Sequence, residues 1–175
     1  MRNKLLLLVV GLATVLLSAQ AQQNLPVDHI EKEVRHEILM LPYFSVFDNI
    51  TFNVSGGAVT LMGQVTNPTL KGQVGNVVKN IEGVQSVVNK IEVLPPSTMD
   101  DGLRRQLFRA IYGYPALEKY AMPVVKPIRI IVNMGHVSLE GVVDNEADKN
   151  MAGLRANGVS GVFSVANNLV VVPPK

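Results

Sequence analysis

The side chains that could do chemistry are few, and their spacing rules out most reactions. The chain has no cysteine, which excludes a disulfide framework, a thiolate nucleophile and a zinc ribbon. No serine lies in a Gly-x-Ser-x-Gly turn, and no His-Glu-x-x-His motif occurs. His29 and His36 would stand about 10 Å apart along a helix, too far to share one metal ion. We therefore expect a chain that is not an enzyme, with no metal, no cofactor and no small-molecule substrate.

Two further motifs have ordinary structural explanations. Asp144, Glu146 and Asp148 gather where a helix is predicted to begin, and the helix dipole favours acidic side chains there. A weak cation site is the alternative at this position. The run Gly158–Gly161 spells the loop of a KH domain, but it lies between a predicted helix and a strand rather than between two helices. Nucleic acid is therefore not an expected partner.

Basic residues are concentrated in the second half of the chain. Between Leu103 and Arg129 there are six lysines and arginines and one acid, Glu118. A helix with an inward stripe is predicted here, and the side chains outside that stripe are the candidate lipid-binding residues Arg104, Arg105, Phe108, Arg109 and Tyr112. Arginines beside an aromatic ring are typical of an interfacial helix, because the charges meet anionic headgroups while the ring enters the acyl boundary.

The alternative for this helix is structural. Phe108 would then pack against the sheet edge or the first domain, and the arginines would form a solvated face.

The elements that carry these side chains occur twice in the chain. Gly57–Pro96 aligns with Gly135–Pro174 without a gap and with sixteen identities in forty positions. Upstream of this stretch the second copy carries five extra residues between Pro115 and Ile128. Copies of this length are too long for solenoid repeats and indicate two small domains, at 28–96 and 97–175.

Each copy reads as helix, strand, strand, helix, strand. Ile30, Val34 and Ile38 recur at helical spacing, and the strand that follows alternates apolar and polar residues. Asn67 followed by Pro68 predicts the start of the second helix. A last strand, Val87–Val93, then returns beside the hairpin through a right-handed crossover. The predicted fold class is α+β: two tandem αββαβ domains, each with two helices packed on a three-stranded mixed sheet.

Residues 1–21 have the pattern of a secretory signal peptide. Arg2 and Lys4 precede an almost unbroken apolar run of thirteen residues, and the small-residue cleavage motif Ala19–Ala21 follows. Thirteen residues are fewer than the roughly 20 that span a bilayer, which favours cleavage over the alternative of a membrane anchor. Loss of Arg2 and Lys4 would leave 14 basic and 14 acidic side chains, a neutral protein. We expect it in the periplasm.

The repeated segments resemble a known family. Gly57–Val65 followed by Gly83–Val93 is similar to the BON domain, named for bacterial osmotically inducible and nodulation proteins, and Gly135–Val143 with Gly161–Val171 repeats the resemblance. The resemblance implies an αββαβ fold, an envelope address and no catalytic activity. Some members of the family bind anionic phospholipid surfaces through the first helix of the second copy, and the resemblance implies the same possibility for this chain. Val74 and Val78 depart from the alanine-rich second helix of many members, and no lipidated cysteine is present.

Two functions remain open at the level of the sequence. The first is an exported, non-catalytic envelope protein that contacts an anionic phospholipid membrane surface peripherally, in envelope maintenance or osmotic stress. The alternative is a protein-binding or chaperone-like module of the periplasm, in which exposed sheet edges or the first helix engage envelope proteins.

Overall fold

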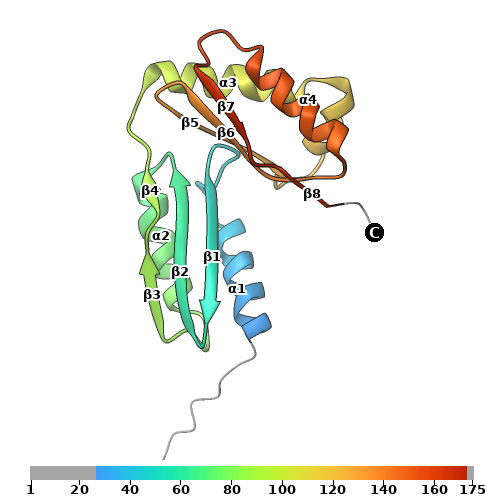
Figure 1. Cartoon of the computed structure of the whole chain (residues 1–175). Coiled ribbons are helices and arrows are strands. Elements are labelled where there is room, and N and C mark those ends of the chain that lie inside the picture. The colour runs from blue at the N-terminus through green and yellow to red at the C-terminus, as the bar shows by residue number, and fades with distance from the viewer. Residues whose placement is uncertain (1–26, 173–175) are drawn as a thin grey trace, which may run out of the picture.

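The computed structural model describes residues 27–172, which form two units of the same architecture (Figure 1). The first unit contains α1 (Val27–Leu39), β1 (Asn49–Ser55), β2 (Ala58–Val65), α2 (Pro68–Lys79), β3 (Ser86–Asn89) and β4 (Glu92–Val93). The second contains α3 (Thr98–Tyr112), the short 3-10 helix η1 (Pro115–Ala121), β5 (Ile128–Asn133), β6 (His136–Val143), α4 (Glu146–Asn157), β7 (Ser164–Asn167) and β8 (Val170–Val171). The α+β class and the two similar domains are confirmed. The predicted signal peptide lies outside the described residues.

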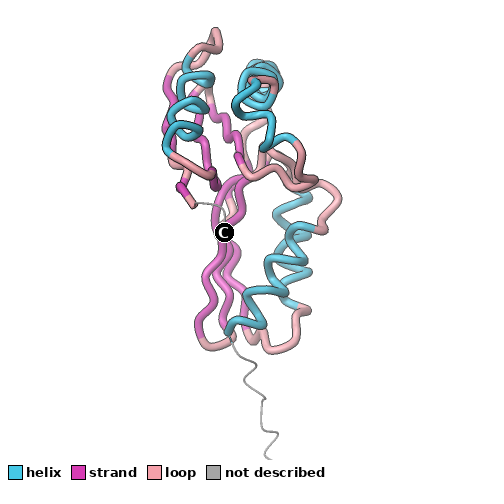
Figure 2. Tube along the Cα trace, turned by 90° about the vertical axis from the view of Figure 1, so that its right-hand side faces the viewer, coloured by secondary structure: helices cyan, strands magenta, loops and turns pink. Residues whose placement is uncertain are grey.

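The two sheets have the same topology. β2 is the central strand of the first sheet, antiparallel to β1 and parallel to β3 and β4, and β6 has the same position in the second sheet. In the first unit the helices form one layer and the sheet forms the other, as Figure 2 shows. Within residues 27–172, no helix combines the length and the apolar character needed to cross a bilayer.

The last strand of each copy is interrupted, which corrects the single strand predicted over Val87–Val93. The side chain of Asn89 accepts a hydrogen bond from the N–H of Ile91 at 3.1 Å and donates one to the carbonyl of Lys71 at 2.8 Å. The N–H of Ile91 is therefore satisfied locally instead of by β2. Both segments keep one register with β2, so the three-stranded layout survives the break. Asn167 donates equivalently to the carbonyl of Lys149 at 2.7 Å.

The repeated apolar positions form two equivalent cores. Val59 is 0% exposed and its counterpart Val137 is 2% exposed, and both lie on the central strand facing the helices. Leu61 and Leu139 are likewise fully buried. Each domain therefore has its own hydrophobic core, as the duplicated pattern predicts.

The second core differs because its second helix is less bulky. Ala152 and Ala156 stand where α2 has Val74 and Val78, and all four side chains are fully buried. The extra residues of the second copy fold into η1, whose Leu117 and Tyr120 are buried in the same core: they pack in a cluster with the two alanines. The insertion thus supplies volume that the small side chains of α4 leave open.

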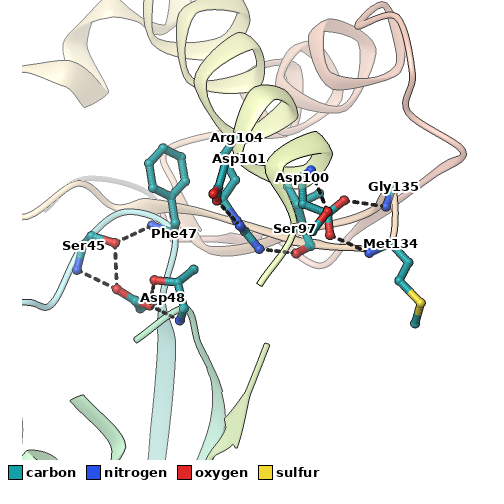
Figure 3. Close-up of polar contacts among 11 residues, drawn as sticks. Ser45, Phe47, Asp48, Ser97, Asp100, Asp101, Arg104, Met134 and Gly135 are labelled. Carbon is teal, nitrogen blue, oxygen red and sulfur yellow. Dashed lines mark hydrogen bonds and ion pairs between the residues drawn. The ribbon is translucent and has the colours of Figure 1, made fainter. Parts of the chain in front are cut away.

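The two units are joined by direct contacts as well as by the linker. The loop between α1 and β1 reaches the edge of β5, where the N–H of Ile130 donates to the carbonyl of Val46 at 2.9 Å. Beside it, the guanidinium of Arg129 donates to the carbonyl of Ser45 at 3.0 Å. The buried carboxylate of Asp48 holds this loop, since it accepts from the N–H and hydroxyl groups of Ser45 and Thr66 (Figure 3).

A close backbone crossing occurs at the same point of both hairpins. Gly63 and Gly141 have φ values of +113° and +106°. A Cβ atom on Gly141 would lie 2.0 Å from the carbonyl oxygen of Pro127, a separation that real Cβ atoms do not show. Only glycine fits this backbone and this approach.

We expect Gly141→Ala to lower the free energy of unfolding by about 2 to 6 kcal/mol, from overpacking together with backbone strain. Urea denaturation followed by circular dichroism measures the change. Gly72→Ala is the matched control: Gly72 lies inside α2 with open space around it, so this change should stabilise by about 0.5 to 1 kcal/mol. Equal stability of the Gly141→Ala variant and the wild type would contradict this account of the crossing.

Candidate functional site

The helix α3 places the predicted lipid-binding residues. Its inward stripe of Leu103, Leu107 and Ile111 is buried as predicted. Ser97 caps the helix, since its hydroxyl accepts the N–H of Asp100 at 3.1 Å. The five candidate residues therefore sit on a well-anchored helix, but they do not share one environment.

Arg104 is buried, which corrects its predicted place on a solvent-facing side. The residue is 5% exposed, and its guanidinium donates to Asp101 at 2.6 Å and to the carbonyl of Val132 at 2.6 Å (Figure 3). The arginine thereby ties α3 to the end of β5. A side chain held in this way positions the helix and is not available to a ligand.

Tyr112 is also buried, a second correction. It is 4% exposed, and its hydroxyl donates to the carbonyl of Ile128 at 2.5 Å and accepts the N–H of the same residue at 3.2 Å. Burial raises the pKa of Tyr112 well above its ordinary value, against the opposing effects of the Ile128 bond and the charge of Arg129. The neutral tyrosine links the end of α3 to the start of β5.

Asp100 has a role that the sequence did not reveal. It lies in the first turn of α3, and its buried carboxylate accepts the N–H groups of Met134 at 2.8 Å and Gly135 at 2.9 Å (Figure 3). Met134 has a φ of +49°, a conformation that the first copy gives to a glycine, Gly56. The carboxylate of Asp100 therefore holds the tight turn of the second hairpin.

Three of the five candidates remain at the surface, and residues of the first unit join them. Arg105 and Arg109 are exposed and Phe108 is half-buried. Val46 and Phe47, from the loop before β1, line the same mostly apolar hollow of about 310 Å³. We call the five residues that line this hollow the α3 face: Val46, Phe47, Arg105, Phe108 and Arg109.

The rings of the α3 face are packed together. The centroid of Phe108 lies 6.4 Å from that of Phe47 and 5.0 Å from that of Tyr112. The structural alternative for Phe108 is therefore correct in that one side of the ring contacts the first domain. No sequence pattern points to Phe47, because its contact with Phe108 spans sixty-one positions and follows only from the docking of the two units.

The acidic cluster at the start of α4 already has a cation from the chain itself. The ammonium of Lys119 lies 2.7 Å from both Asp144 and Asp148, and Tyr120 donates to Asp148 at 2.6 Å. Burial would raise the pKa of Asp148, but the bonds from Lys119, Tyr120 and Asn145 outweigh it and hold the pKa below its usual value. Among residues 27–172, no group of three or more histidine, aspartate or glutamate side chains is arranged to hold a metal ion.

Comparison with known proteins identifies the repeat. The BON domain signature matches residues 26–95 and 116–173. The chain belongs to the BON domain family. The two matches also confirm the tandem BON arrangement predicted from the internal repeat, although the second begins within η1 and leaves out α3. BON domains are non-catalytic binding or structural modules, so the family assignment gives no support to an enzyme.

Solved structures and curated proteins add little to this assignment. Two structures of CdsD, a structural protein of the type III secretion system of Chlamydia trachomatis, align with 13% and 15% identity and a TM-score of 0.30 each. The alignments cover 84% and 85% of this chain and 94% and 99% of the CdsD chains. A comparison with curated proteins found no relative that matches the chain.

The different environments of Arg104 and Arg105 in the second BON domain give a stability test. We expect Arg104→Gln to lower the free energy of unfolding by about 2 to 4 kcal/mol, because it leaves the carbonyl of Val132 without its buried donor. The neighbouring Arg105→Gln should change it by less than about 0.5 kcal/mol. Urea denaturation of both variants makes the comparison, and equal losses would mean that Arg104 does not tie α3 to the sheet.

The Asp148 cluster predicts a loss of stability in acid. Because the folded pKa of Asp148 lies below its unfolded value, its contribution is complete above the unfolded value of about 3.9 and is lost as the pH falls through the folded pKa. We expect Asp148→Asn to be less stable than wild type at pH 7, with a smaller further loss below about pH 4. Denaturation curves between pH 2.5 and 7 measure this, with Glu146→Gln, an exposed change on the same helix, as the control. Parallel profiles for Asp148→Asn and wild type would rule out the cluster as the source.

Proposed function

We propose that this protein is an exported, non-catalytic component of the cell envelope that binds anionic phospholipid surfaces peripherally in envelope maintenance or stress. The observation that supports this function is the composition of the α3 face, where two exposed arginines flank a hollow lined by Phe47 and Phe108. The predicted signal sequence supports a periplasmic location.

The charges of the α3 face are free to meet a membrane. Arg105 and Arg109 form no ion pair with another residue of the 27–172 segment. Each would contribute about 1 kcal/mol near an anionic surface, and partial insertion of one ring would add about 2 kcal/mol. A total near 4 kcal/mol corresponds to a dissociation constant of about 1 mM. One domain therefore binds weakly, and useful attachment requires a second contact or several copies.

The buried residues of α3 support this role indirectly. Arg104, in the middle of α3, and Tyr112, at its C-terminal end, tie the helix to the two ends of β5, and the Tyr112 ring lies against that of Phe108. Because the ring is already ordered before contact, little side-chain entropy is lost when it enters the interface. The two residues act as positioning residues for the α3 face.

Sedimentation with phosphatidylglycerol vesicles tests the proposal. We expect binding at low salt that weakens as salt is added, because it depends on exposed charge. Arg105→Gln or Arg109→Gln should weaken it about fivefold, the equivalent of about 1 kcal/mol, and Phe108→Ala or Phe47→Ala about tenfold or more.

Lys79→Gln is the matched control, since Lys79 is an exposed cation on α2 without an ion pair in the described segment. It removes the same charge and should leave binding unchanged. The absence of sedimentation at low salt, or an equal loss with Lys79→Gln, would count against membrane contact through the α3 face.

A further inference from the structure

A second surface lies at the edge of β1, apart from the α3 face. Among residues 27–172, β1 pairs with β2 alone, and its other side opens into a cleft of about 380 Å³ between the two domains. Asn49, Ile50, Thr51 and Phe52 all line this cleft. Since side chains alternate between the faces of a strand, four consecutive residues share one groove only where it runs along the strand edge. The backbone edge of β1 therefore forms one wall.

The other walls come from both domains. The C-terminal half of α1 borders the groove beside Phe44, and the segment before β5 faces it from the second domain. The walls outside β1 include Ile38 and Leu39 of α1, Phe44, and residues 125–127 before β5. The groove is thus built only because the two domains are docked.

The charge of the groove is of one sign. Its lining includes the cations Arg35, Lys126 and Arg129 and no acidic residue. The guanidinium of Arg129 lies 4.4 Å from the centroid of Phe44, and that of Arg35 lies 5.6 Å from the centroid of Phe52. Neither forms an ion pair within residues 27–172. Two guanidinium groups ordered on aromatic rings beside a groove are placed to receive carboxylates.

The acids nearest to Arg129 are engaged elsewhere. Asp48 is fully buried and its oxygens accept bonds from Ser45 and Thr66. Glu140 lies opposite Arg129 in the β5–β6 register, but its carboxylate accepts from Ser138 and Asn168. Neither lines the groove. The charge of Arg129 is therefore available to a ligand.

The backbone wall decides between two kinds of anionic ligand. An acyl chain lying along β1 would remove the unpaired backbone N–H and C=O groups of β1 from water. The acyl chain offers no hydrogen bonds in return, so this burial is unfavourable. An extended peptide would satisfy these groups by adding a strand. The chain already uses an edge in this way, since the carbonyl of Val46 accepts the N–H of Ile130 on the edge strand β5.

We propose that the groove along β1 binds an extended, acidic peptide segment of a partner protein by strand addition, with Arg35, Lys126 and Arg129 receiving its carboxylates. The bound strand would pair with Asn49–Phe52. This interaction goes beyond membrane contact and uses a different set of side chains.

Fluorescence anisotropy with a labelled eight-residue peptide of alternating valine and glutamate tests this proposal on the full chain. We expect saturable binding that weakens with salt, and a loss of about fivefold for Arg35→Gln and for Arg129→Gln. Arg35 is exposed and has no bond across the domain contact, so its variant keeps the docking intact. Arg105→Gln, the same change on the α3 face, is the control and should bind the peptide as wild type does.

A peptide N-methylated at alternate residues separates strand addition from charge attraction. It keeps the carboxylates but lacks the N–H donors for one edge, so we expect at least a tenfold loss of binding. Amide hydrogen exchange at Asn49–Phe52 should slow when the unmodified peptide binds.

Three results would overturn the proposal: equal binding of the N-methylated peptide, an equal loss with Arg105→Gln, or binding of dodecyl phosphate without binding of the peptide. The last would identify an anionic amphiphile as the ligand of the groove. If the Phe108→Ala variant binds the peptide as strongly as the wild type does, peptide binding does not depend on the proposed membrane contact.

Discussion

The docking of the loop before β1 onto the edge of β5 is the interaction on which both proposed binding surfaces depend. Its backbone bond, from the N–H of Ile130 to the carbonyl of Val46, is accompanied by the bond from Arg129 to Ser45. Asp48 stabilises the loop because its carboxylate accepts hydrogen bonds from Ser45 within the loop and from Thr66 directly after β2. Because the loop then presents Phe47 to α3 and Phe44 to Arg129, one contact completes the α3 face and also supplies part of the lining of the β1 groove.

The fold could be predicted from the sequence because the chain contains the same apolar pattern in two copies. Identical apolar residues at a constant offset identify the central strands, and Val59 and Val137 are buried as that pattern requires. The departures arise where a polar side chain or a distant segment intervenes. Asn89 breaks the last strand through its own amide, and η1 fills the space beside Ala152. Neither effect is visible in hydrophobic periodicity, which records which residues are apolar and not how much volume a helix must fill.

The candidate site could be predicted only in part. Helical spacing identified the buried stripe of α3 and left Arg105, Phe108 and Arg109 outside it, as the structure has them. The spacing of apolar residues along a helix does not show how wide the buried face of that helix is. A long arginine such as Arg104 can reach a backbone carbonyl beyond its own stripe, and a tyrosine can bury its ring if its hydroxyl finds a partner. Phe47 is beyond the reach of any such pattern, because its neighbourhood is set by tertiary docking.

Binding at each of the two proposed surfaces is expected to be weak, for related reasons. Because both surfaces belong to one scaffold, two weak contacts can act together. Each relies on a few cations that solvent screens, so neither holds a partner tightly alone. Because the domain contact fixes the α3 face relative to the β1 groove, a protein on a membrane would also present the groove at high local concentration to segments near that membrane. The two contacts then reinforce each other without any change of shape. A rearrangement of the Asp48 loop would weaken both at once, because that loop supplies Phe47 to one surface and Phe44 to the other.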